Sequence, residues 1–149
     1  MFSGSISHAF TAYAVTCLVL CLNLLVLWGY SGGVRTSAKS TANPEDAKLF
    51  KSELSEVEPP ALTRTLRAHA NAEAAIYPFL FLGLVYVLAG GAAKVAAIIF
   101  AVFVVARLAH SAFYVAAVQP WRTISFTVGA LATLVLMGAL VVRLVQMGH

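Results

Sequence analysis

Charge is scarce in this sequence. Lysine, arginine, aspartate and glutamate together make up 11 % of the 149 residues, against about 25 % in a typical soluble domain. Hydrophobic residues make up 60 % of the chain, so its exterior must be largely apolar. The composition therefore excludes an ordinary soluble domain and indicates a chain that is solvated by lipid.

Cysteine and the usual catalytic motifs are also nearly absent. Cys17 and Cys21 lie four residues apart with no strong acid or base beside them, which predicts packing roles. We find no metal-ligand constellation, no serine–histidine–acid set and no phosphate loop, so we expect no metal site, hydrolase or nucleotide enzyme. The net charge of +4 comes from dispersed residues and predicts no nucleic-acid partner.

The sequence has four long apolar runs instead. They cover residues 8–30, 66–88, 93–118 and 122–147, and each reaches the roughly 20 residues that a helix needs to cross a bilayer. The first run follows no basic segment and is longer than the apolar part of a cleavable signal, so we interpret it as a retained span. We expect a single all-α integral membrane domain over residues 1–149.

Short links join the last three runs, which predicts an up-down bundle of four transmembrane helices. The polar segment 31–64 should form a cap near the headgroups. Most basic residues fall on its side, so the positive-inside rule places the cap in the cytoplasm and both termini opposite. So thin a bundle favours oligomers. The small residues of the fourth run could serve contacts between subunits or packing within one: Gly129, Ala132, Thr133 and Gly138.

Ionisable side chains inside membrane helices are costly and usually face a cavity or a partner. Here they recur at helical spacing in two stripes: Arg64, Arg67 and Asn71 on the second run, and Arg107, His110, Ser111 and Tyr114 on the third. Taken singly, the arginines near helix ends are also compatible with snorkelling to headgroups, and Tyr114 with an interfacial belt. Arg107 lies too deep to snorkel, so we expect it to have a buried partner.

The fourth run begins with an arginine and a hydroxyl, Arg122 and Thr123, directly after Trp121. The first turn of a helix has free backbone N–H groups and a positive end, which favour an anion. The predicted topology brings this turn and both stripes to the cytoplasmic level. The sequence therefore predicts a site for a small polyanionic ligand beside lipid.

Several segments resemble one family. They are residues 42–47 (ANPEDA), 64–69 (RTLRAH), 76–83 (IYPFLFLG), 107–110 (RLAH) and 120–123 (PWRT). Together with Asn71 and Tyr114, they resemble the membrane-associated proteins in eicosanoid and glutathione metabolism, the MAPEG family. The likeness covers about residues 30–128, and its motifs are specific.

This resemblance implies a homotrimeric glutathione-dependent enzyme, a transferase, peroxidase or isomerase, that acts on lipophilic electrophiles or lipid peroxides. It implies a glutathione site that opens towards the cytoplasm and the bilayer. Arg122 would stabilise the thiolate, with Thr123 as an auxiliary donor and Asp46 as a nearby acid of the cap. The residues around glutathione would be Arg35, Arg67, Asn71, Arg107, His110, Tyr114 and Arg122.

Three positions depart from the family pattern. An acid of the family is Ala74 here, and the neighbouring Glu73 is a candidate to replace it by pairing with Arg107 or with the ligand amine. A basic residue is replaced by Ala70, and a tyrosine by Phe126. The alternative hypothesis is a non-catalytic lipid-presenting protein of the same fold, which would be marked by loss of the anion-binding arginines. Those arginines are retained.

Overall fold

Four long helices dominate the computed structural model, which describes residues 8–41, 43–55 and 57–148. All four are long and apolar enough to cross a membrane: α1 (His8–Ala38), α3 (Pro60–Leu88), α4 (Ala93–Val115) and α5 (Trp121–Met147). The predicted all-α fold with four apolar helices is confirmed. Ala42, the first residue of the 42–47 segment, lies outside the described residues, as do the ends of the predicted 1–149 domain.

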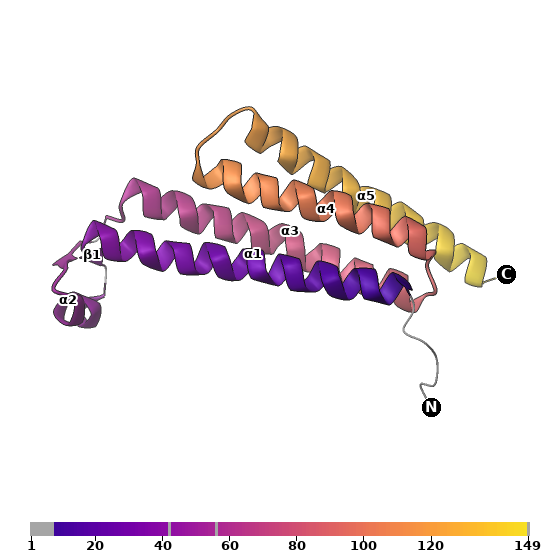
Figure 1. Cartoon of the computed structure of the whole chain (residues 1–149), viewed down its shortest axis with the longest axis horizontal. Coiled ribbons are helices and arrows are strands. Elements are labelled where there is room, and N and C mark those ends of the chain that lie inside the picture. Colours follow the sequence, from indigo (N-terminus) through magenta and orange to yellow (C-terminus); the bar gives the residue numbers. More distant parts are fainter. Residues whose placement is uncertain (1–7, 42, 56, 149) are drawn as a thin grey trace.

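Consecutive long helices run antiparallel, as the short links require (Figure 1). Helix α1 packs against α3 and α4, and α5 packs against α4 and α3. Helices α1 and α5 therefore occupy opposite sides of the bundle. The beginning of α1 and the end of α5 lie at one end, while the cap between α1 and α3 and the α4–α5 link lie at the other (Figure 1).

Aromatic rings fill the bundle centre. The rings of Phe79 and Phe103 stack with centroids 3.6 Å apart, and Phe100 meets Phe79 edge to face at 5.7 Å. Gly83 lets α3 and α4 approach closely, because a Cβ there would lie 3.2 Å from the Phe100 ring. By contrast, outward leucines such as Leu18 are 72 % exposed. The apolar exterior matches the lipid environment that the composition predicts.

The cap is shorter than the polar segment 31–64. Helix α1 continues to Ala38, and hydroxyls of its last turns are satisfied by carbonyls of the same helix: Ser31 Oγ donates to the Trp28 carbonyl at 2.6 Å, and Thr36 Oγ1 to the Gly32 carbonyl at 3.0 Å. Helix α3 already begins at Pro60, a residue suited to the first turn. Between them lie β1 (Ser40–Thr41), α2 (Pro44–Phe50) and β2 (Glu53–Leu54), with β1 and β2 paired in parallel.

The small residues of α5 differ in how deeply they pack within the subunit. Gly129 packs inside the subunit, where its Cβ would lie 3.3 Å from Arg107 Cδ, and Ala132 is 6 % exposed. Thr133 Oγ1 donates back to the Gly129 carbonyl at 3.1 Å. A Cβ on Gly138 would meet no described atom within 4 Å. Of the four, Gly138 is the one that leaves a flat exposed surface.

Candidate functional site

Three basic side chains, two from α3 and one from α5, line one cavity at the cap end of the bundle. The cavity has a volume of about 380 Å³ and is lined by Glu58, Pro60, Thr63, Arg64, Arg67, Tyr114 and Arg122. Helix α3 starts at this end and α4 returns to it, so the polar stripes predicted on both helices meet the first turn of α5 there. The structure thus brings Arg67, Tyr114 and Arg122 together.

Arg122 is held on two sides. Its guanidinium carbon lies 4.8 Å from the centroid of the Tyr114 ring, a cation–π contact. The hydrogen bonds of Gln119 are satisfied when its amide oxygen faces Arg122. This oxygen then accepts from Arg122 Nε at 3.1 Å and from Arg122 Nη2 at 2.6 Å. The amide nitrogen of Gln119 donates to Thr123 Oγ1 at 3.0 Å. Gln119 therefore positions both the guanidinium and the hydroxyl in the first turn of α5.

His110 ties α4 to the start of α5. The ring is 3 % exposed, and Nδ1 lies 2.9 Å from the Arg122 carbonyl oxygen. A carbonyl can only accept, so Nδ1 carries the proton and donates this bond. No described residue bonds to the buried Nε2. The His110 ring also meets Tyr114 edge to face at 5.6 Å, so the histidine orders both residues that frame the cavity.

Arg107 is the largest fully buried side chain among the described residues, with 1 % exposure. Its Nη2 donates to Asn71 Oδ1 at 2.8 Å, which pairs the two predicted stripes across α3 and α4. Phe126 lies beside the guanidinium, with its centroid 6.0 Å away. Nε has no hydrogen-bond partner among the described residues. The expected buried partner of Arg107 is thus a neutral amide, and part of its bonding capacity stays unused.

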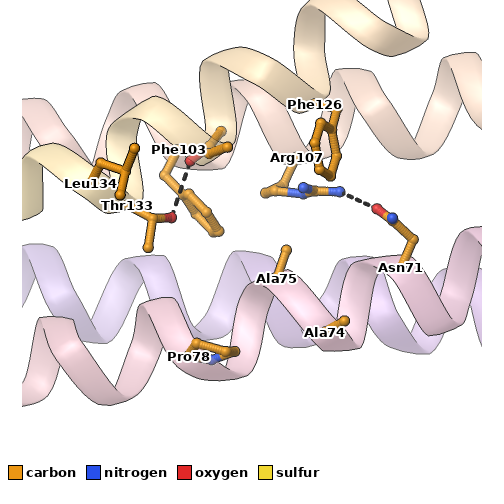
Figure 2. Close-up of a pocket in the computed structure, with 11 residues that line it drawn as sticks. Asn71, Ala74, Ala75, Pro78, Phe103, Arg107, Phe126, Thr133 and Leu134 are labelled. Carbon is orange, nitrogen blue, oxygen red and sulfur yellow. Dashed lines mark hydrogen bonds between the residues drawn. The ribbon is translucent and has the colours of Figure 1, made fainter. Parts of the chain in front are cut away.

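A second cavity of about 430 Å³ lies deeper in the bundle, beside Arg107 (Figure 2). Figure 2 shows the guanidinium between Asn71 and Phe126, with Ala74 on the facing helix. The remaining walls are mostly apolar: Ala75, Pro78, Phe103, Gly129, Ala130, Thr133 and Leu134. With alanine at position 74, this cavity contains a buried cation and no acid in its lining.

Three of the predicted site residues, Arg35, Asp46 and Glu73, line neither of these two cavities. Asp46 lines a separate cavity of about 320 Å³ under the cap together with Arg35, and accepts a bond from Asn43 Nδ2 at 3.0 Å. Glu73 accepts from the Tyr77 hydroxyl at 3.1 Å and lies 3.5 Å from His69 Nδ1. Within the subunit, Glu73 therefore does not take the expected role of partner to Arg107, whose amide partner is Asn71.

Two residues of the site were missed by sequence reasoning. Glu58 lines the Arg122 cavity, and its Oε1 accepts from Arg35 Nη2 at 3.4 Å. Gln119 forms the bonds to Arg122 and Thr123 described above. Both lie next to prolines that start a helix, Pro59–Pro60 and Pro120, which is a signal that their side chains face a helix N-terminus.

The fold and the site define a class: a polytopic four-helix membrane protein with an arginine-lined cavity at one end of the bundle. A sequence model of the MAPEG family matches residues 13–142. The chain is 40 % identical to human prostaglandin E synthase over 124 residues, which cover 79 % of this chain and 82 % of that protein. It is 34 % identical to microsomal glutathione S-transferase 1 of Rattus norvegicus over 144 residues, 90 % of this chain and 88 % of that one.

The chain belongs to the MAPEG family. The resemblance noted from the sequence motifs is therefore confirmed. The match extends beyond the motif-bearing region of about residues 30–128, since it covers most of α1 and α5. Prostaglandin E synthase of Equus caballus is similar at 39 % identity over 124 residues, 79 % of this chain and 81 % of that protein.

Proposed function

We propose that the protein is a glutathione-dependent membrane enzyme that acts on lipophilic electrophiles or lipid peroxides, as a transferase, peroxidase or isomerase. The observation that supports this best is the cavity in which Arg64, Arg67 and Arg122 meet the N-terminus of α5. The names of the relatives, prostaglandin E synthase and microsomal glutathione S-transferase, support the same class of reaction.

The residues around the site fit glutathione. The tripeptide has two carboxylates, and guanidinium groups bind carboxylates with two parallel hydrogen bonds. The volume of about 380 Å³ is within the range of small-ligand pockets, about 300–1,000 Å³. Arg107 and His110 lie outside the lining of this cavity, and His110 holds the Arg122 carbonyl at its edge. We assign Arg67 to the carboxylates of glutathione and Arg122 to its thiol. Asn71, Arg107 and His110 hold the surrounding helices in place.

Glutathione supplies a thiol whose sulfur, as the thiolate, attacks an electrophilic carbon or a peroxide oxygen. The chain's part is to favour the charged sulfur. The Arg122 guanidinium and the positive end of α5 do so electrostatically. Thr123 Oγ1 accepts its bond from the Gln119 amide, so its own hydrogen stays free to donate to the sulfur. Thr123 is then the auxiliary donor of the site.

We propose a homotrimer with the cap and the glutathione site in the cytoplasm. The exposed apolar faces of the outer helices α1 and α5, including the open surface at Gly138, supply area for contacts between subunits or with lipid. Arg35 and Asp46, which line the cap cavity, would then act near the mouth of the site. Cross-linking in native membranes, resolved by gel, tests the trimer.

The test of the function is glutathione binding by calorimetry on detergent-purified protein, with ultraviolet absorbance to detect bound thiolate. Arg67→Ala should weaken binding roughly 10- to 100-fold, because a hydrogen bond to a charged group contributes about 1.5–3 kcal/mol. Lys94→Ala removes a charge from an exposed position at the far end of α4 and is the matched control. It should bind like the wild type.

Arg122→Ala should abolish the thiolate signal and turnover while the assembly persists. Full turnover in a trimeric Arg122→Ala protein would refute the mechanism. If the wild type does not bind millimolar glutathione, the enzyme proposal fails and lipid presentation becomes the better account.

A further inference from the structure

Glu58 has an unusual place in the arginine cavity. It precedes Pro59 and Pro60 at the start of α3, and its side chain lines the cavity with Arg64, Arg67 and Arg122. It is the one acidic residue in that lining. Its one described ion pair is with Arg35 on α1.

The opposite charges of this cavity are kept apart. The Arg35–Glu58 pair is long, at 3.4 Å, and both side chains are about one-third exposed or more, at 40 % and 34 %. None of the three arginines in the cavity lining lies within ion-pair distance of Glu58 in the described structure. The lining therefore presents three guanidinium groups and one carboxylate that is not paired with them. A zwitterion that carries carboxylates and an ammonium group can meet both kinds of charge.

The other acids near the site are committed elsewhere. Asp46 accepts from Asn43 and lines the separate cap cavity. Glu73 bonds to the Tyr77 hydroxyl and contacts His69. Because position 74 is an alanine, the lining of the deeper cavity has no acid either. Glu58 is thus the carboxylate best placed to meet a ligand's ammonium group.

We propose that Glu58 recognises the ammonium group of the thiol peptide and so determines which thiols the protein accepts. The inference rests on the proposed use of glutathione and adds its amine specificity. In this arrangement, Arg35 donates to Oε1 of Glu58. No described residue donates to Oε2, so this oxygen can accept from the ammonium group. The arginines of the cavity lining bind the ligand carboxylates.

The test compares two ligands on three proteins by calorimetry. The ligands are glutathione and its deaminated analogue, glutaryl-cysteinyl-glycine, in which hydrogen replaces the amine. The proteins are the wild type, Glu58→Gln, and Glu53→Gln as the matched control. Glu53 is an exposed cap acid on β2, outside the cavity lining, so its variant removes the same charge from the cap. Thermal unfolding and size-exclusion profiles check that each variant keeps its fold.

The wild type should prefer glutathione to the analogue about tenfold or more, as a charge-assisted hydrogen bond predicts. Glu58→Gln should bind glutathione about tenfold more weakly and bind the analogue unchanged or more tightly, so that the preference disappears. Glu53→Gln should keep the preference. Glu58→Asp, which retains the charge, should recover part of it.

Three results would overturn the inference about Glu58 without contradicting the proposal that the wild type binds glutathione. Equal losses for both ligands in Glu58→Gln would mean a structural role. Equal gains for both would mean that Glu58 competes with the ligand carboxylates for the arginines. An unchanged preference would place the ammonium group elsewhere. Failure of the wild type to bind either ligand would instead refute the proposed function.

Discussion

The pair formed by Arg107 and Asn71 allows a quantitative test of how a charge is kept inside this bundle. Arg107 is 1 % exposed, its only described hydrogen-bond partner is the neutral amide of Asn71, and its Nε is already unpaired. Asn71→Ala removes that partner. We expect it to lower the free energy of unfolding by about 1.5–3 kcal/mol, the usual contribution of a hydrogen bond to a charged group.

The companion variants are Arg107→Met and the double variant. Arg107→Met removes the buried charge and leaves only an amide unpaired beside a cavity, so it should cost less than Asn71→Ala. The double variant should cost less than the sum of the two, with a coupling energy of about 1.5 kcal/mol or more. Unfolding is followed by circular dichroism in mixed micelles titrated with dodecyl sulfate, without glutathione. Additive effects, with coupling below about 0.5 kcal/mol, would refute the argument.

Three further predictions concern α5 and the link before it. Gln119→Leu removes the acceptor that holds Arg122 at 2.6 and 3.1 Å. Turnover and the thiolate signal should therefore fall several-fold, with a smaller change in glutathione affinity. A fall in affinity as large as the fall in turnover would contradict a positioning role for Gln119. Gly129→Ala should destabilise the protein, because the new Cβ would lie 3.3 Å from Arg107 Cδ and the Arg107 side chain, buried and bonded to Asn71, has little room to move. Gly138→Ala has open space and should be neutral or stabilise the helix by up to about 1 kcal/mol in thermal unfolding. If cross-linking shows fewer trimers in Gly138→Ala, this surface lies between subunits.

The four helices were predictable because hydropathy and length alone specify them in a membrane chain. The meeting of the two polar stripes also followed from topology, since antiparallel helices with short links return Arg107 and His110 to the level of Arg67. The ends of the helices were harder to predict. Residues 31–38 lie outside the apolar run, yet α1 continues through them, and the Thr36 and Ser37 hydroxyls are satisfied by carbonyls of the same helix, a contact that hydropathy does not register.

Glu58, the acid in the cavity lining, was the hardest feature to predict. The resemblance to the family implies an acid at the position of Ala74, and sequence reasoning turned to the adjacent Glu73, which is about 100° away around the helix and bonds to Tyr77 instead. Glu58 lies sixteen positions before Ala74, outside any periodic pattern, and it lines the cavity only because α3 begins two residues later. A helical period relates residues on one helix, whereas the place of a loop residue depends on where the next helix starts. A search for an acid missing from a membrane helix should therefore include the residues just before each helix N-terminus.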